Sequence, residues 1–260
     1  MPLVIPQKAQ RELVTVARNY YVRADGNDAN NGLANTAGGA FLTIQKAVDV
    51  IADTLDLSAN VTINIGPGTY AGATLRRVVG KGSVTITGDT VTPANVTISH
   101  TTTCFNANGT FAYVLTGMKL TNSAGYGVIC ANAQITIANI EFAACVSGHI
   151  YVSAPGLLSV ASPGYTITGG ASYHILVDPN GTLICDGRTV TITGTPAFPN
   201  GFCVCVNGTA LIRSNTYSGA TTGKRYDVSL NGAINTLSAA NPTYFPGSVA
   251  GTATTGGQYV

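Results

Sequence analysis

The chain of 260 residues has no tryptophan, only two methionines, and few charges, with 9% charged residues and a formal net charge of +2. A net charge this small gives no electrostatic basis for binding nucleic acid, whose affinity comes largely from contacts between cations and phosphates. No apolar run reaches the roughly 18 residues of a membrane-spanning helix. The first residues, 1–6, do not predict a signal peptide, because their apolar run is short and contains two prolines. We therefore expect no nucleic-acid partner, no membrane insertion, and synthesis in a cytoplasm without the usual export.

No pair of cysteines has the CxxC spacing, which excludes zinc-ribbon and thioredoxin-like sites. The six cysteines are Cys104, Cys130, Cys145, Cys185, Cys203 and Cys205. Most of them stand beside Val, Ile or Phe, so we interpret them as small buried apolar residues. Disulfide pairing is the alternative, and it would need an oxidising compartment.

The sequence does contain a repeat, in which a short turn precedes an alternating apolar strand. The turns are Asn108-Gly109, Pro155-Gly156, Asn180-Gly181, Asn207-Gly208 and Asn231-Gly232, with Ala131-Asn132-Ala133 in a corresponding place without the glycine. The strands that follow start near Ala112, Ile135, Leu158, Leu183, Leu211 and Ile234, at intervals of 23, 23, 25, 28 and 23 residues. A nearly constant period of this length with a strand in each unit is typical of a β-solenoid, whose units bury their apolar faces only by stacking. An antiparallel hairpin at the Asn-Gly turns is the alternative.

The region before the repeat has a different pattern. Phe41, Ile44, Val48, Ile51 and Leu55 recur at helical spacing and predict one amphipathic helix over 41–57. We expect this helix to cover the open end of the solenoid, where strand edges and core would otherwise be exposed. The predicted organisation is an N-terminal arm at 1–19, a strand, loop and capping helix at 20–60, and a parallel β-helix at 61–260.

The last strand of each unit aligns with those of its neighbours by the turn that follows. The aligned rows are 127–130, 149–152, 174–177, 203–206 and 227–230. Because side chains of a strand alternate between its two faces, the second and fourth residues of each row form the predicted core. The third column faces outward although it is mostly apolar, and it contains Ile129, Tyr151, Leu176 and Cys205. A tall outward apolar column predicts that this face is shared with another copy of the chain.

The first column of these rows also faces outward in this alignment and contains His149, His174 and Cys203. These residue types can bind metal ions, so the three are the candidates for a metal site. We favour the simpler interpretation of a polar border beside the apolar column, and we expect no metal and no cofactor.

Acidic residues are scarce on the predicted coils. Hydrolysis of a glycosidic bond needs two carboxyl groups within roughly 5–9.5 Å of each other. Asp178, Asp186 and Glu141 are the candidates if the chain is an enzyme, and Arg188 lies close to Asp186 in the sequence. No two of the acids form an evident pair, so we predict no catalysis.

Several segments resemble a known superfamily. Residues 20–32, 41–48 and 61–70, with the sequences YYVRADGNDANNG, FLTIQKAV and VTINIGPGTY, resemble the opening of right-handed parallel β-helix proteins of the pectate-lyase-like superfamily. The nearest likeness is to the phage tailspike and tail-fibre branch, and the C-terminal segment 244–259 resembles the endings of phage structural proteins.

This resemblance implies an all-β, right-handed parallel β-helix that assembles as a homotrimer in a virion after synthesis in the host cytoplasm. It implies a spike or fibre of a phage tail or neck that attaches to other virion proteins through its N-terminal arm and contacts the host surface, including host glycans. Two alternatives remain open, because this fold carries many activities. One is a polysaccharide depolymerase, either a glycoside hydrolase or a lyase, and the other is a purely architectural virion decoration.

Overall fold

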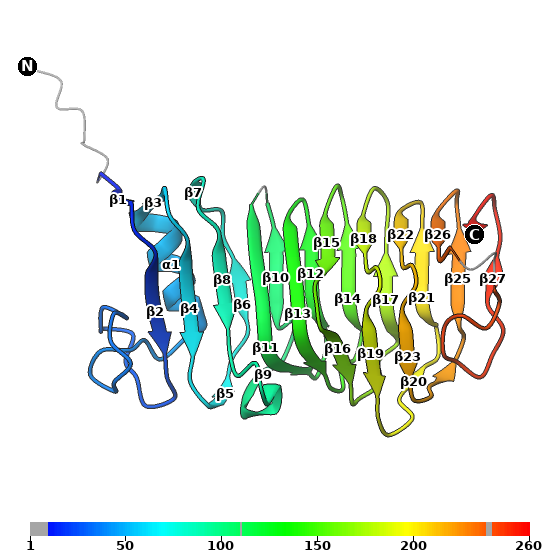
Figure 1. Ribbon diagram of the computed structural model, residues 1–260, viewed down its shortest axis with the longest axis horizontal. Coiled ribbons are helices and arrows are strands. Elements are labelled where there is room, and N and C mark those ends of the chain that lie inside the picture. The colour runs from blue at the N-terminus through cyan, green and yellow to red at the C-terminus, as the bar shows by residue number, and fades with distance from the viewer. Residues whose placement is uncertain (1–9, 110, 238–240) are drawn as a thin grey trace, which may run out of the picture.

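A computed structural model describes residues 10–109, 111–237 and 241–260. It is a parallel β-solenoid of about eight coils, with 48% of the residues in strands and one α-helix (Figure 1). The coils stack along a single axis from the N-terminal end to the C-terminal end, so the predicted fold class is confirmed. Within the described part of the chain, no helix has the length and apolar character that a membrane span requires.

Two large sheets form the walls of the solenoid. The eight-stranded sheet has the order β27-β25-β21-β17-β14-β12-β10-β6. Its strands are β6 (Ala73–Leu75), β10 (Phe105–Asn108), β12 (Tyr126–Ala131), β14 (Gly148–Ser153), β17 (Tyr173–Val177), β21 (Gly201–Val206), β25 (Tyr226–Ser229) and β27 (Thr252–Ala253). All neighbours in it are parallel, as stacked coils require.

The fifteen-stranded sheet bends around the rest of each coil. Its upper strands are β2 (Arg18–Val22), β4 (Val61–Ile65), β8 (Val84–Thr87), β11 (Ala112–Asn122), β13 (Gln134–Phe142), β15 (Leu157–Val160), β18 (Thr182–Ile184), β22 (Thr209–Leu211), β26 (Ala233–Asn235) and β28 (Gln258–Tyr259). Its lower strands are β5 (Gly68–Tyr70), β9 (Val96–His100), β16 (Gly164–Ile167), β19 (Thr189–Ile192) and β23 (Thr216–Ser218). The long strands β11 and β13 belong to both parts, because each bends at a residue with positive φ, Gly117 or Asn139.

The remaining elements are short. A three-stranded sheet contains β1 (Glu12–Val14), β3 (Leu55–Leu57) and β7 (Val79–Gly80), and a two-stranded sheet contains β20 (Ala197–Phe198) and β24 (Thr222–Gly223). A single 3-10 turn, η1 (Pro93–Asn95), precedes β9. In the predicted arm, residues 12–14 pair with β3, while residues 1–9 lie outside the described residues.

The α-helix covers the N-terminal end of the solenoid. Helix α1 (Ile44–Thr54) begins after Thr43, whose hydroxyl accepts a hydrogen bond from the backbone N–H of Lys46. Thr74 lies in β6, the outermost strand of the eight-stranded sheet. The Gln45 side chain forms two hydrogen bonds with the backbone of Thr74, at 2.8 and 3.2 Å. This amide therefore pairs with a strand edge that would otherwise face water. The prediction of a helix over 41–57 was too long at both ends, since residues 41–43 precede the helix and residues 55–57 form β3.

The Asn-containing turns form one corner of the solenoid. Asn132, Asn180, Asn207 and Asn231 all have φ between 51° and 63°, in the left-handed region that asparagine tolerates better than most residues. Each of these backbones hydrogen-bonds to the corresponding turn of the next coil. Asparagine thus serves a stacked corner here, and the hairpin alternative is wrong at Asn180-Gly181 and Asn207-Gly208 because the flanking strands pair in parallel.

The observed register confirms most of the predicted alignment and corrects parts of it. Tyr113 aligns with Ile135 and Ala210 aligns with Leu183, so the repeat differs by one residue from the strand starts near Ala112 and Leu211 that the sequence predicted. A similar slip by one residue affects β21. Ile175 aligns with Cys203, and Val177 aligns with Cys205, so both cysteines point into the core.

The prediction that Cys205 and Cys203 face outward is therefore wrong, and Val204 takes the outward position between them. Every residue of the run 202–206 is apolar, so alternation alone does not decide which set faces inward. The preceding coil is also longer than its neighbours, which removes the other guide to register. All six cysteines are buried and free, as the interpretation of small apolar residues predicted.

Candidate functional site

The three candidate catalytic acids lie in separate contacts. Glu141 pairs with Lys119 at 3.0 Å and accepts a hydrogen bond from the Thr168 hydroxyl at 2.9 Å. No hydrogen bond or ion pair joins Glu141 to Asp178 or Asp186. The three acids therefore make no direct contact with one another, and each has its own partner.

The two aspartates are also engaged by neighbouring coils. Asp186 forms an ion pair with Arg213 that includes a hydrogen bond from Nε at 2.9 Å, and this arginine lowers the pKa of the carboxyl group. Asp178 accepts a hydrogen bond from the Tyr151 hydroxyl at 2.9 Å. Arg188, which the sequence placed near Asp186, donates instead to the carbonyl oxygen of Val160 at 3.1 Å. These contacts tie successive coils together and leave each acid occupied by a structural partner.

His149 and His174 are buried in the core, so the prediction that they border the outer face is wrong. Each stands one residue before an inward-facing isoleucine, in a strand whose pairing skips the histidine. Two consecutive side chains therefore point inward at this bend. Strict alternation of faces, on which the sequence interpretation relied, does not hold there.

The two imidazoles belong to one chain of hydrogen bonds. Nε2 of His149 lies 3.0 Å from the carbonyl oxygen of Ala143, the two Nδ1 atoms are 2.9 Å apart, and Nε2 of His174 lies 2.8 Å from the Tyr165 hydroxyl. A carbonyl oxygen only accepts, so His149 carries its proton on Nε2 and accepts at Nδ1. His174 then donates from Nδ1 and accepts from Tyr165. Every nitrogen has one partner while both rings stay neutral.

Burial favours this neutral state. It lowers the pKa of His149 to about 3 and places the pKa of His174 well below its ordinary value, with the neighbouring His149 as a second cause. Aromatic rings surround the pair, with Phe142 stacked on His149 and Phe202 against His174. Within the residues that the structure describes, no group of three or more potential ligands is arranged to hold a metal ion. The lone pairs that a metal would need at His149 and His174 are already used in hydrogen bonds.

The outward column of the eight-stranded sheet contains Ile129, Tyr151, Leu176 and Val204. Tyr151 stacks on Tyr126 with ring centroids 5.0 Å apart. Leu176 is only 9% exposed and Val204 only 7%, whereas Ile129 and Tyr151 are half-buried. Leu176 and Val204 are thus covered within the chain itself. Of the four residues in the column, Ile129 and Tyr151 are the most accessible to a partner.

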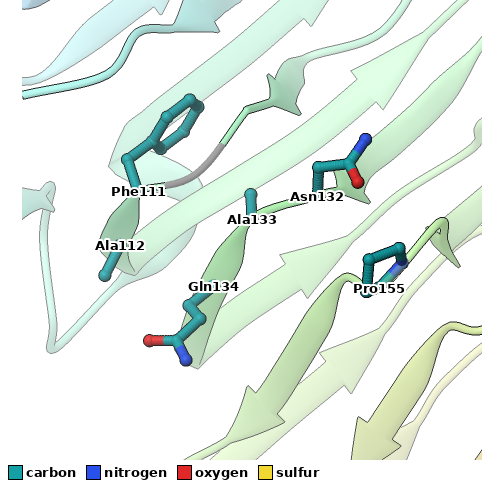
Figure 2. A pocket seen from close by; sticks show the side chains of 6 residues that line it. All are labelled: Phe111, Ala112, Asn132, Ala133, Gln134 and Pro155. Atoms are coloured by element: carbon teal, nitrogen blue, oxygen red, sulfur yellow. The ribbon is translucent and has the colours of Figure 1, made fainter.

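Two hollows in the surface share Phe111 in their lining. The smaller has a volume of about 360 Å³ and is lined by Phe111, Ala112, Asn132, Ala133, Gln134 and Pro155 (Figure 2). The larger has a volume of about 700 Å³ and lies on the other side of Phe111, toward Arg76 and Arg77. We call these two hollows together the corner groove. The stacking of successive coils brings its walls together.

Sequence reasoning missed the corner groove. Its residues are single positions in turns that were treated only as coil boundaries, and Phe111 stands two residues after the Asn108-Gly109 turn. The available signal was an aromatic residue at a corner where the following coils have the small residues Ala133 and Gly156.

Comparisons with known proteins add no identity. No family model, no curated protein and no solved structure matches the chain.

Proposed function

We propose that the chain is a virion structural protein, a trimeric spike or fibre of a phage tail or neck, that contacts glycans of the host surface without cleaving them. One observation carries this proposal: the acids that cleavage would need are held in separate structural contacts along a rigid stack of coils. A rod of this kind presents surface features at fixed positions, which suits attachment and display.

The order of elements at the N-terminal end supports the same proposal. The segments that resemble the opening of phage β-helix proteins form strand β2, the loop before Phe41, helix α1 and strand β4. Val22 bridges to Phe41, and β2 pairs with β4, so the three segments assemble into one end of the rod. An arm preceding such an end is well placed to attach the rod to a larger particle.

The trimer is supported by the outward column. Ile129 and Tyr151 lie on adjacent strands. The outward column that they begin continues through Leu176 and Val204 on the next two strands. A closed symmetric assembly would cover this face in every copy at once. Cys205 no longer contributes, because its side chain is in the core.

The assembly is tested by light scattering on the wild-type protein and on Tyr151→Glu. Three copies of this substitution would gather like charges in a desolvated contact, so the variant should lose the trimer. Asn106→Glu is the matched control, since Asn106 lies in the same column two rungs before Tyr151 and outside the apolar part. A wild-type protein that stays monomeric at micromolar concentration overturns the trimer.

The absence of cleavage and the place in a particle need separate measurements. Purified protein is incubated with surface polysaccharide of the host, and chain length is followed by gel filtration. Shortened chains that disappear in Asp186→Asn would replace the proposal with a depolymerase. Electron microscopy of particles with and without the gene product would show whether the protein is part of a tail or neck, and its absence from particles would overturn the virion assignment.

A further inference from the structure

The larger hollow of the corner groove has positive charges that acids of the protein neutralise only in part. Arg11, Arg76 and Arg77 line this hollow, and Asp53 is the only acid among the lining residues. Arg76 pairs with Asp53 and with Asp49, so its charge is matched within the protein. The groove therefore depends on the other two arginines for any attraction of a ligand.

Those two arginines remain partly or wholly available. Arg11 uses one guanidinium nitrogen, Nη1, to donate to the carbonyl oxygens of Ala52 and Leu55 at the end of α1. Arg77 is exposed and makes no ion pair or side-chain hydrogen bond with any residue that the structure describes. An exposed arginine beside a hollow presents the planar donor fork that matches a carboxylate.

The rest of the groove is suited to a ring that carries hydroxyl groups. Asn108, Asn132 and Gln134 are exposed, and their amide groups make no hydrogen bond with any residue that the structure describes. Each amide offers both donors and an acceptor, as sugar hydroxyls do. Phe111 lines both hollows and stands edge-on to Tyr113, with ring centroids 5.5 Å apart. An aromatic face of this kind packs against the C–H face of a sugar ring.

Other ligand classes fit this surface less well. Nucleic acid would need several phosphate contacts, but the groove has one free arginine and one that is partly free. A peptide that adds a strand would need an open sheet edge, whereas β11 already pairs with β8 on one side and β13 on the other. The combination of amides, an aromatic ring and a single free cation favours a carbohydrate with separated negative charges.

We infer that the corner groove binds an acidic polysaccharide, with a sugar carboxylate at Arg77 and an adjoining sugar ring against Phe111. This inference rests on the proposed glycan contact and names the class of glycan and the residues that select it. Arg77 sets the preference for an acidic sugar, while Phe111 and the amides provide affinity for the ring itself.

The test measures binding of the full chain to oligomers of polygalacturonate, with dextran as the neutral probe and dextran sulfate as an unrelated polyanion. We expect polygalacturonate to bind at least tenfold more tightly than either dextran. Arg77→Gln should weaken polygalacturonate binding about tenfold, since it removes one charge-assisted contact. Phe111→Ala should weaken binding of every saccharide that the groove holds.

Arg225→Gln is the matched control, because it removes the same charge on a distant coil. Circular dichroism spectra and melting curves check each variant, and Phe111→Leu replaces Phe111→Ala if the latter does not fold. Equal effects of Arg77→Gln and Arg225→Gln would overturn the inference, because net charge would then explain the loss. So would tighter binding to dextran sulfate.

The results separate this inference from the proposed function. Equal binding of dextran and polygalacturonate that depends on Phe111 would remove the acidic preference and leave the glycan contact in place. Binding that neither Arg77→Gln nor Phe111→Ala affects would place the site elsewhere and overturn the inference alone. No binding of any saccharide would overturn the inference and the glycan contact together, while the trimer and the place in a particle would still be decided by their own measurements.

Discussion

The two halves of the solenoid have the same backbone arrangement but differ in their cores. The N-terminal coils, residues 55–122, stack mainly aliphatic side chains, such as Ile63 on Ile86 and Ile86 on Leu115. The C-terminal coils, residues 144–245, enclose the two histidines within a cluster of aromatic rings that includes Phe198 and Phe202. The same coil architecture therefore accommodates either an aliphatic core or a core with buried polar groups. The polar groups need every hydrogen-bond partner to be present.

The ends differ as well. Helix α1 covers the first coil, and Ile51 on its inner side is fully buried. At the other end, Val249 is 54% exposed and Val260 is 47% exposed. We therefore expect stability to be unevenly distributed along the stack, because each coil contacts mainly its neighbours.

Acid should destabilise the C-terminal coils first. Burial lowers the folded-state pKa of His149 to about 3 and that of His174 well below its ordinary value, while both titrate near 6.5 when unfolded. Their contribution is therefore present above pH 6.5 and is lost as the pH falls toward the folded-state pKa. Between pH 6 and pH 4 His149 alone should cost about 2–3 kcal/mol of unfolding free energy, and the lowered pKa of His174 adds to this loss.

Urea unfolding at several pH values measures this loss, and hydrogen exchange locates it. Exchange should accelerate in β14 and β17 at a pH where β4 and β8 remain protected. The triple variant His149→Leu, His174→Leu, Tyr165→Phe provides the control, since it removes the titrating pair together with its phenol partner. If its pH dependence equals that of the wild type, the histidines are not the cause.

A charge placed at the covered end should have the next largest effect. Ile51→Asp would bury an unpaired carboxylate under the first coil and should cost about 3–5 kcal/mol. Val249→Asp, at the open end, is the matched substitution and should change the unfolding free energy by no more than about 0.5 kcal/mol. Both values come from urea denaturation, and similar losses in the two variants would mean that α1 gives the first coil no special protection.

Much of the fold follows from the sequence, because a repeat leaves the same signal in every unit. The intervals between Ile135, Leu158 and Leu183 match the observed register, and Ile44, Val48 and Ile51 do form the buried side of α1. Each of these residues lies in a segment whose alternation or helical period contrasts apolar with polar positions. The contrast is what specifies the face that turns inward.

The candidate site was harder to predict, for physical reasons. Cys203 and Cys205 stand in a run with no polar residue, so sequence alternation carried no information on their orientation. His149 and His174 point inward only because their strands bend, and their polarity is satisfied by partners that the fold supplies. Phe111 gains its role from hollows between coils. Contacts that depend on the stacking of distant segments have no local signature.

Removing one hydroxyl from each core should sharpen the comparison on a smaller scale. Tyr165→Phe leaves Nε2 of the fully buried His174 without a donor, so it should cost about 1–3 kcal/mol. In the N-terminal coils, Tyr113 donates to the carbonyl oxygen of Arg76 at 3.0 Å. Tyr113→Phe should cost less, about 0.5–1.5 kcal/mol, because its acceptor belongs to the half-buried Arg76, whereas His174 is fully buried.

Melting curves and urea midpoints at pH 7 rank the two tyrosine variants. A loss in Tyr113→Phe equal to that in Tyr165→Phe would show that the polar chain is no more demanding than an ordinary hydrogen bond. In that case the two cores would differ in the shapes of their side chains but not in how strongly they depend on hydrogen bonds.

The smallest effect is expected at the corner that the two halves share. Ala154 occupies the left-handed region with φ of 42° in the turn that stacks between the turns of Asn132 and Asn180. A residue with a Cβ other than asparagine or aspartate is strained there, so Ala154→Gly should relieve strain. Glycine also enlarges the unfolded ensemble, which offsets part of this gain. We expect a net stabilisation of about 0.5 kcal/mol, measured as a higher urea midpoint with an unchanged slope.

Asn207→Ala makes the opposite change at an equivalent corner and should destabilise by about 1 kcal/mol. If both substitutions shift the midpoint in the same direction, backbone conformation does not set the cost of this corner, and side-chain contacts of the asparagines must explain why the turns repeat.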